Sequence, residues 1–101
     1  MTVTQKLHLF LSDKDNFLIR LRFLEGLDTH NLNEFMALLG EAERSISGRI
    51  MIEKKLASML IEIVPVLLSL SESYKGTERE KIDQAVKDIS EQITAIFYCE
   101  E

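Results

Sequence analysis

Residues 56–70 read LASMLIEIVPVLLSL, and this stretch decides the fold. Only Ser58, Glu62 and Ser69 in it are polar, so apolar side chains surround almost the whole helix that it predicts. Such a helix is central in a bundle or shared between two subunits. Its 15 residues are fewer than the roughly 20 that a membrane-spanning helix needs. We therefore expect it to form a buried contact between helices or chains.

The C-terminal part of the chain predicts the clearest helix, over about residues 78–98. Apolar residues recur there at spacings of four, three, four and three: Ile82, Val86, Ile89, Ile93 and Ile96. This spacing is typical of a narrow seam that packs on one neighbouring helix. Before it, Gly76 is expected to end the preceding helix. Thr77 and Glu80 have the spacing of a capping box.

Two further helices are predicted in the middle of the chain. The first begins with Asn31 at the N-cap and Glu34 at the third position. Gly48 either ends it or weakens it by about 1 kcal/mol relative to alanine. Apolar residues at helical spacing resume over residues 49–73. Pro65 lies inside this segment, so we expect either a kink near it or a helix that starts there.

Residues 4–26 allow two interpretations. KLHLFL and FLIRLRF both alternate as half-buried strands do, with SDKDN as a possible hairpin turn between them. The segment is nevertheless rich in leucine, with few β-branched residues. Ser12 and Asp15 could cap a helix that runs to Gly26, where Leu27 suits a Schellman end. We favour the helix.

The fold expected from these elements is all-α, an up-and-down bundle of four or five helices in one domain over residues 1–101. The alternative is an N-terminal β-hairpin followed by three helices. The apolar run at 56–70 exceeds what so small a bundle needs to cover, and large exposed apolar patches are unusual on monomers. A homodimer is therefore expected.

Composition narrows the function. The net charge of −5 and the pI of about 5.0 disfavour direct binding to nucleic acid, which needs clustered basic residues. Cys99 is the only cysteine, which fits a reducing compartment. The N-terminus lacks the basic region and cleavage site of a signal peptide. We expect a cytoplasmic protein with no membrane span.

No catalytic motif or cofactor-binding motif stands out, and we expect no enzyme activity, cofactor or metal. His30 and Glu34 lie one helical turn apart, but zinc needs three or four ligands and no third one lies near them in sequence. Cys99 is followed by Glu100 and Glu101, whose charge disfavours a reactive thiolate.

Three charged residues lie in apolar surroundings. Arg20 and Arg22 could grip a phosphate or a partner's carboxylate, or extend from the edge of the core to pair with acidic groups. Glu62 has three possible positions: a rim facing water, an ion pair across a helix interface with Arg20, Arg22 or Arg49, or a functional carboxylate.

The candidate interface residues form two groups. The apolar group comes from the central helix: Leu60, Ile61, Val64, Leu67 and Leu68. The acidic group comes from the last helix: Glu78, Asp88 and Glu91. Residues 77–101 hold three basic and seven acidic side chains, a net charge of −4. Such a surface would attract a basic partner.

These features indicate a non-enzymatic protein-binding module of the immunity protein, secretion chaperone, antitoxin or regulatory adaptor type. The 14 residues NFLIRLRFLEGLDT, at 16–29, resemble the start of the small bacterial Hha-type modulators of nucleoid proteins. That resemblance implies an alternative function, a transcription or nucleoid modulator that acts through a DNA-binding partner. A small-ligand carrier is the third possibility, and a deep apolar pocket with converging polar groups would favour it.

Overall fold

The computed structural model describes residues 1–46 and 48–98. It contains five helices and no strand within those ranges, which confirms the all-α fold and rejects the hairpin. The helices are α1 (Val3–Ser12), α2 (Phe17–Arg22), α3 (Thr29–Ile46), α4 (Lys54–Ser71) and α5 (Gly76–Phe97). None of the described helices is long and apolar enough to cross a membrane.

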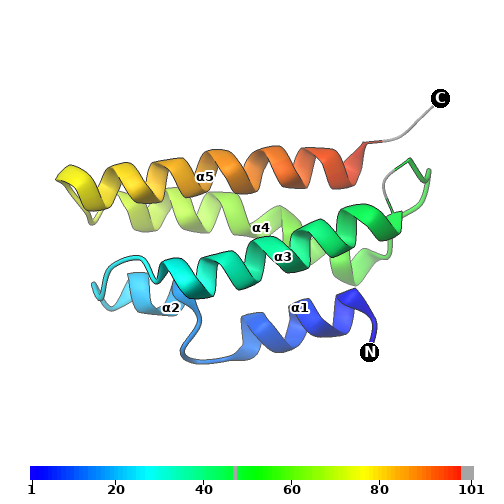
Figure 1. The fold of residues 1–101 in the computed structure, drawn as a ribbon, viewed down its shortest axis with the longest axis horizontal. Helices are drawn as coiled ribbons and strands as arrows, with labels where there is room; N and C mark the ends of the chain where they lie inside the picture. Colours follow the sequence, from blue (N-terminus) through cyan, green and yellow to red (C-terminus); the bar gives the residue numbers. More distant parts are fainter. Residues whose placement is uncertain (47, 99–101) are drawn as a thin grey trace.

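The helices form an up-and-down four-helix bundle in which α1 and α2 together take the place of the first helix (Figure 1). We call α1 and α2 together the first arm. That arm packs against α3 and α4, and α5 packs against the same two helices. Among the described residues, α3 and α4 do not contact each other closely. They therefore occupy diagonally opposite corners of the bundle.

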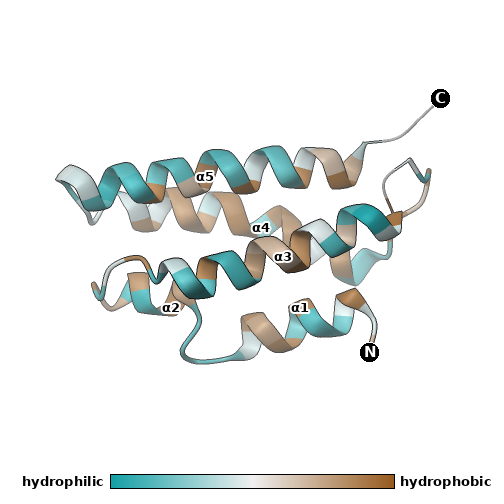
Figure 2. Ribbon diagram, viewed as in Figure 1, coloured by the Kyte–Doolittle hydropathy of each residue, from teal (hydrophilic) through white to brown (hydrophobic). Residues whose placement is uncertain are grey.

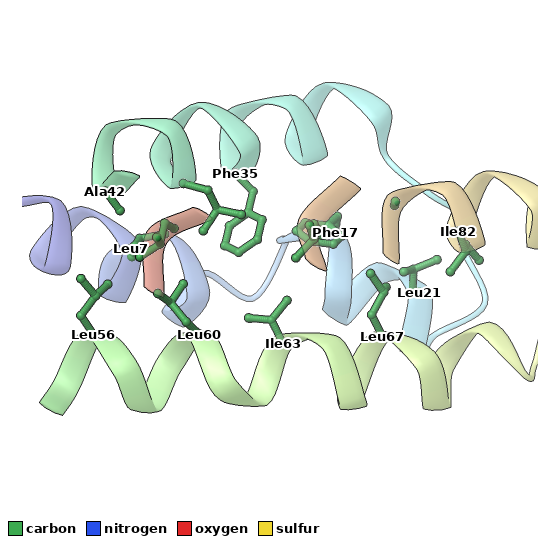
Figure 3. Close-up of a cluster of buried hydrophobic side chains, with 14 of the residues drawn as sticks. Leu7, Phe17, Leu21, Phe35, Ala42, Leu56, Leu60, Ile63, Leu67 and Ile82 are labelled. Carbon is green, nitrogen blue, oxygen red and sulfur yellow. The ribbon is translucent and has the colours of Figure 1, made fainter. Parts of the chain in front are cut away.

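One hydrophobic core runs the length of the bundle, and the apolar sides of the helices face it (Figure 2). Helix α4 contributes a row of buried side chains at helical spacing: Leu56, Leu60, Ile63 and Leu67. Figure 3 shows this row facing Leu7, Phe17, Leu21, Phe35 and Ala42 from the other helices. From α5, Ile82, Ile89 and Ile96 are buried as the seam predicts, with Val86 and Ile93 half-buried beside them.

The first arm is divided into α1 and α2 between Ser12 and Phe17, where a polar side chain caps the start of α2. Asn16, rather than Ser12 or Asp15, is the N-cap of α2, and its side chain accepts the Ile19 N–H at 3.0 Å. The predicted Schellman end does occur, but earlier than Gly26. Leu24 takes the left-handed conformation there, with φ 61°, and its N–H and that of Glu25 donate to carbonyl groups of α2 at 3.0 and 2.9 Å.

The boundaries of α3 differ from the predicted ones because Asn31 is used elsewhere. Its side chain accepts the backbone N–H of Phe17 at 2.7 Å and so ties α3 to α2. Asp28 instead accepts the Asn31 N–H at 3.0 Å at the start of the helix. The helix ends at Ile46, and Gly48 takes a left-handed φ of 84° after it. Gly48 therefore follows a helix end rather than weakening a helix interior.

Helix α4 is shorter than the segment 49–73 and runs unbroken through Pro65. A helix start at Pro65 was therefore a wrong alternative. The residues before Lys54 are not helical. Glu53 takes an extended backbone at the N-cap, and its carboxylate accepts the Thr4 hydroxyl at 3.1 Å.

The capping box predicted at Thr77 and Glu80 is absent. Helix α5 begins at Gly76, and its N-cap residue makes no side-chain capping bond. Helix α4 ends at Ser71, well before Gly76, because the turn between them carries the buried Tyr74. The Tyr74 hydroxyl donates to the Leu21 carbonyl at 2.9 Å and accepts the Gly26 N–H at 3.2 Å. This turn therefore fastens α2 to the start of α5.

Candidate functional site: a groove beside helix α4

The break in the first arm leaves a hollow against α4. Residues of α1, the break, α2 and α4 surround about 300 Å³ of space there. Most of the wall is apolar, because α2 and α4 turn aliphatic side chains toward each other. The lining residues are His8, Leu11, Ser12, Asn16, Leu18, Ile19, Arg22, Met59, Glu62, Ile63 and Val66.

Two further hollows lie next to this one, one in each direction along α4. Toward the start of the chain, His8 is shared with a hollow that Lys55 also lines. Toward the end of α4, Arg22 and Val66 are shared with a hollow that reaches Leu70. The three hollows follow one another from Lys55 to Leu70, a length of about 22 Å at 1.5 Å per helical residue. We call this row of hollows the α4 groove.

Two opposite charges stand unpaired at this groove. Within the described chain, neither Arg22 nor Glu62 has an ion-pair or hydrogen-bond partner, and both side chains are exposed. Arg20, two residues away, pairs with Asp28 at 3.1 Å. Of the positions open to Glu62, the structure therefore shows the rim facing water and not an ion pair. Arg20 and Arg22 thus differ in pairing, because only Arg20 has an acidic partner within the described chain.

The charge of the α4 groove differs from that of the whole chain. Lys55 and Arg22 lie along it, with His8 between them and Glu62 as the acidic residue. Counting His8 as neutral, these side chains sum to +1, on a chain whose net charge is −5. A partner's carboxylate would meet a favourable charge here, and Arg22 offers a fork of donors that suits it.

The predicted apolar interface residues separate into core and surface. Leu60 and Leu67 are 2% and 0% exposed, so they are core residues of this fold rather than contact residues. Val64 is half-buried. Ile61 and Leu68 are 64% and 49% exposed on the outer side of α4. These two are the members of the apolar group that a partner can reach.

The acidic residues of α5 also have different environments. The Glu78 carboxylate accepts the Leu27 N–H at 2.7 Å and lies 3.8 Å from the Lys81 amine, so it has a structural role. Asp88 is exposed and accepts a bond from Gln84 at 2.9 Å, and Glu91 is exposed. Over residues 77–98 there are five acidic and three basic side chains, a net charge of −2. Half of the expected −4 thus comes from residues outside the described chain.

The other side chains considered from sequence lie apart from the groove. His30 and Glu34 form an exposed pair with 3.0 Å between their nearest nitrogen and oxygen atoms. Among residues 1–46 and 48–98, no group of three or more histidine, cysteine, aspartate or glutamate side chains could hold a metal ion. The prediction for Cys99 lies outside the described residues.

Sequence reasoning missed the groove because its walls come from segments that are distant in the chain. His8, Ile19 and Met59 carry no motif, and each is an ordinary residue of an amphipathic helix. One local signal was present: residues 13–16 read DKDN, four consecutive polar residues inside an apolar arm. That run marks the break, and the break creates the hollow.

Comparison with known proteins adds no assignment. No family model, no curated protein and no solved structure matches this chain.

Proposed function

We propose that this protein is a non-enzymatic binding module that holds a segment of another protein in the α4 groove. The observation that carries the proposal is the row of three hollows with largely apolar walls beside α4, with the unpaired charges of Arg22 and Glu62 at its edge. Apolar walls supply affinity, and a few placed polar groups fix orientation. Charges left unpaired inside the fold remain available for a partner.

The groove dimensions suit an amphipathic helix. A path of about 22 Å matches roughly 15 helical residues, which present apolar anchors every three or four positions. The partner chemistry that fits best is an apolar stripe flanked by a carboxylate for Arg22 and a basic group for Glu62. This differs from the basic partner that the acidic residues of α5 favour. On this chain the groove combines apolar surface with unpaired charge, whereas Glu78 on α5 is already engaged.

Charge reversals at the groove test this proposal by affinity capture from a lysate of the host organism. Arg22→Glu and Glu62→Arg change exposed side chains, so both variants should fold as the wild type does. We expect each to retain at least tenfold less of the captured partner, because each places a like charge against it. Bound protein is quantified by mass spectrometry.

The matched control is Ile50→Asp. Ile50 is 85% exposed in the connection before α4 and does not line the three hollows of the groove. Capture should be unchanged in this variant. Equal capture by the wild type and both charge-reversal variants would move the binding site away from the groove.

A small-ligand carrier is the second candidate, favoured by the same hollow of about 300 Å³. That volume is at the lower end of ligand pockets, and polar groups converge on it from both walls. An anionic apolar dye, 8-anilinonaphthalene-1-sulfonate, serves as a probe in a fluorescence titration. Saturable binding that Arg22→Glu abolishes, together with no captured protein, would favour the carrier.

The cellular setting is part of the proposal. One cysteine in 101 residues and the absence of a recognised catalytic motif support a non-enzymatic role in the cytoplasm. If the protein is a transcription modulator, the segment held in the groove would belong to a DNA-binding protein, through which the modulator would act.

A further inference from the structure

A second surface of α4 has its own pattern and lies beside the groove, with which it shares only Pro65. Six residues along the outer side of this helix are all exposed, at spacings of four, three, four, three and four: Lys54, Ser58, Ile61, Pro65, Leu68 and Glu72. This is the spacing of a seam that packs against one other helix. We call it the outer seam. No described helix of the chain covers it, although Ile61 and Leu68 are among its largest exposed apolar side chains.

We propose that the outer seam binds the outer seam of a second copy of this chain, with the two α4 helices antiparallel. A two-fold contact uses the same surface on both subunits, so it must be complementary to itself. The outer seam meets that condition. It has apolar residues at its centre, a basic residue at one end and an acidic residue at the other.

The antiparallel register follows from the spacing. When the seam is placed against its own reverse, Lys54 faces the partner's Glu72, and Ile61 faces the partner's Pro65. Leu68 then lies within one helical turn of the partner's Ile61. The two-fold axis repeats each contact, so two Lys54–Glu72 pairs bracket one apolar centre. In a parallel arrangement, like charges would instead face each other at both ends.

The charges at the ends of α4 provide an independent argument. A helix favours acidic groups at its N-terminus and basic groups at its C-terminus. Helix α4 has the reverse at its C-terminus, where the C-cap is Glu72, and at its N-terminus the basic Lys54 follows the acidic N-cap Glu53. Within the described chain neither Lys54 nor Glu72 has an ion-pair partner. An antiparallel second copy brings the partner's Lys54 to the C-terminus, which has no basic residue in its last turn, and brings the partner's Glu72 to Lys54 at the N-terminus.

The size of the surface sets the expected strength. Helix α4 has 18 residues, or about 27 Å. One pair of such helices buries an area near the lower limit of stable interfaces, about 1,200 Å². We therefore expect a reversible dimer with a dissociation constant in the range of roughly 1–100 µM. This inference does not depend on the α4 groove, whose α4 residues other than Pro65 lie on a neighbouring side of the helix.

Charge reversal at both ends of the seam gives a sharp test by sedimentation equilibrium from 1 µM to 1 mM, with reductant present to keep Cys99 reduced. Lys54→Glu and Glu72→Lys should each weaken dimerisation at least tenfold, because each places like charges together twice. The double variant Lys54→Glu/Glu72→Lys should restore it to within about threefold of the wild type. Ile61→Asp should also weaken dimerisation at least tenfold.

The matched control is Phe23→Asp, since Phe23 is 68% exposed and Ile61 is 64% exposed, but Phe23 lies off the outer seam. Its dimerisation should equal that of the wild type. A wild-type mass of 11.6 kDa at every concentration would overturn the proposal. Ile61→Asp with the same dimerisation affinity as the wild type would also overturn it. So would a double variant that dimerises as weakly as the single charge-reversal variants. Circular dichroism confirms that each variant is folded.

Discussion

Leu60→Asp is expected to unfold the protein. Leu60 is 2% exposed in the middle of α4 and faces Leu7 and Ala42 across the core (Figure 3). An aspartate there would bury an unpaired carboxylate, at a cost of several kcal/mol. That cost is a large part of the roughly 5–15 kcal/mol that stabilises a typical domain. Far-UV circular dichroism should show loss of most helix at 25 °C.

The adjacent residue supplies the control. Ile61→Asp makes the same kind of change one position along the chain, but that side chain is 64% exposed. Its helix content and monomer stability should stay close to those of the wild type. Equal stability of the Leu60 and Ile61 variants would show that α4 does not present this side to the core.

Phe35→Ala is expected to produce the second-largest effect. The Phe35 ring is fully buried and lies 5.4 Å, between ring centroids, from both Phe10 and Phe17. These three rings join α1, α2 and α3, so truncation leaves a cavity shared by three helices. Such a truncation costs about 3–5 kcal/mol. In a domain of this size the melting temperature should fall by more than about 10 °C.

Phe23→Ala is the control for Phe35→Ala, because the Phe23 ring is 68% exposed at the end of α2. Urea denaturation of both variants would report the difference in free energy of unfolding. A loss of less than about 1 kcal/mol in Phe35→Ala would contradict the role of the aromatic cluster as the contact that joins the two halves of the first arm to α3.

The helices were predictable because the spacing of apolar residues is a local property of the chain. The seam from Ile82 to Ile96 and the apolar run on α4 both follow it. The caps were not predictable, because they depend on contacts between residues that are distant in the chain. Asn31 has a residue type suited to an N-cap, but its side chain instead bonds to the distant Phe17 N–H. Likewise, Glu78 holds the Leu27 N–H across the bundle.

The groove was harder to predict than the fold. Its residues lie on α1, α2 and α4, and their proximity depends on the diagonal placement of α3 and α4. Sequence analysis did identify Arg22 and Glu62 as unusual charges in apolar surroundings. It could not show that Arg20 finds Asp28 while Arg22 remains unpaired, because that difference depends on tertiary contacts.

Apart from Pro65, which belongs to both, the residues of the groove and of the outer seam lie on neighbouring sides of α4. This double use explains why so apolar a helix occurs in so small a domain. Its buried row builds the core, one flank lines the groove, and the outer side carries Ile61 and Leu68. A dimer through the outer seam would cover Pro65 at one end of each groove, but it would use no residue that lines the hollow between α1, α2 and α4. Two grooves on one dimer would raise the apparent affinity for a partner that offers two segments.

The central claim is that the α4 groove is the binding site for another protein, and amide chemical shifts test it most directly. The ¹⁵N-labelled protein is recorded before and after addition of the partner recovered by affinity capture. The account predicts that the largest shifts cluster at residues lining the groove, including His8, Arg22, Met59 and Val66. Shifts confined to the outer face of α5, around Asp88 and Glu91, would contradict it.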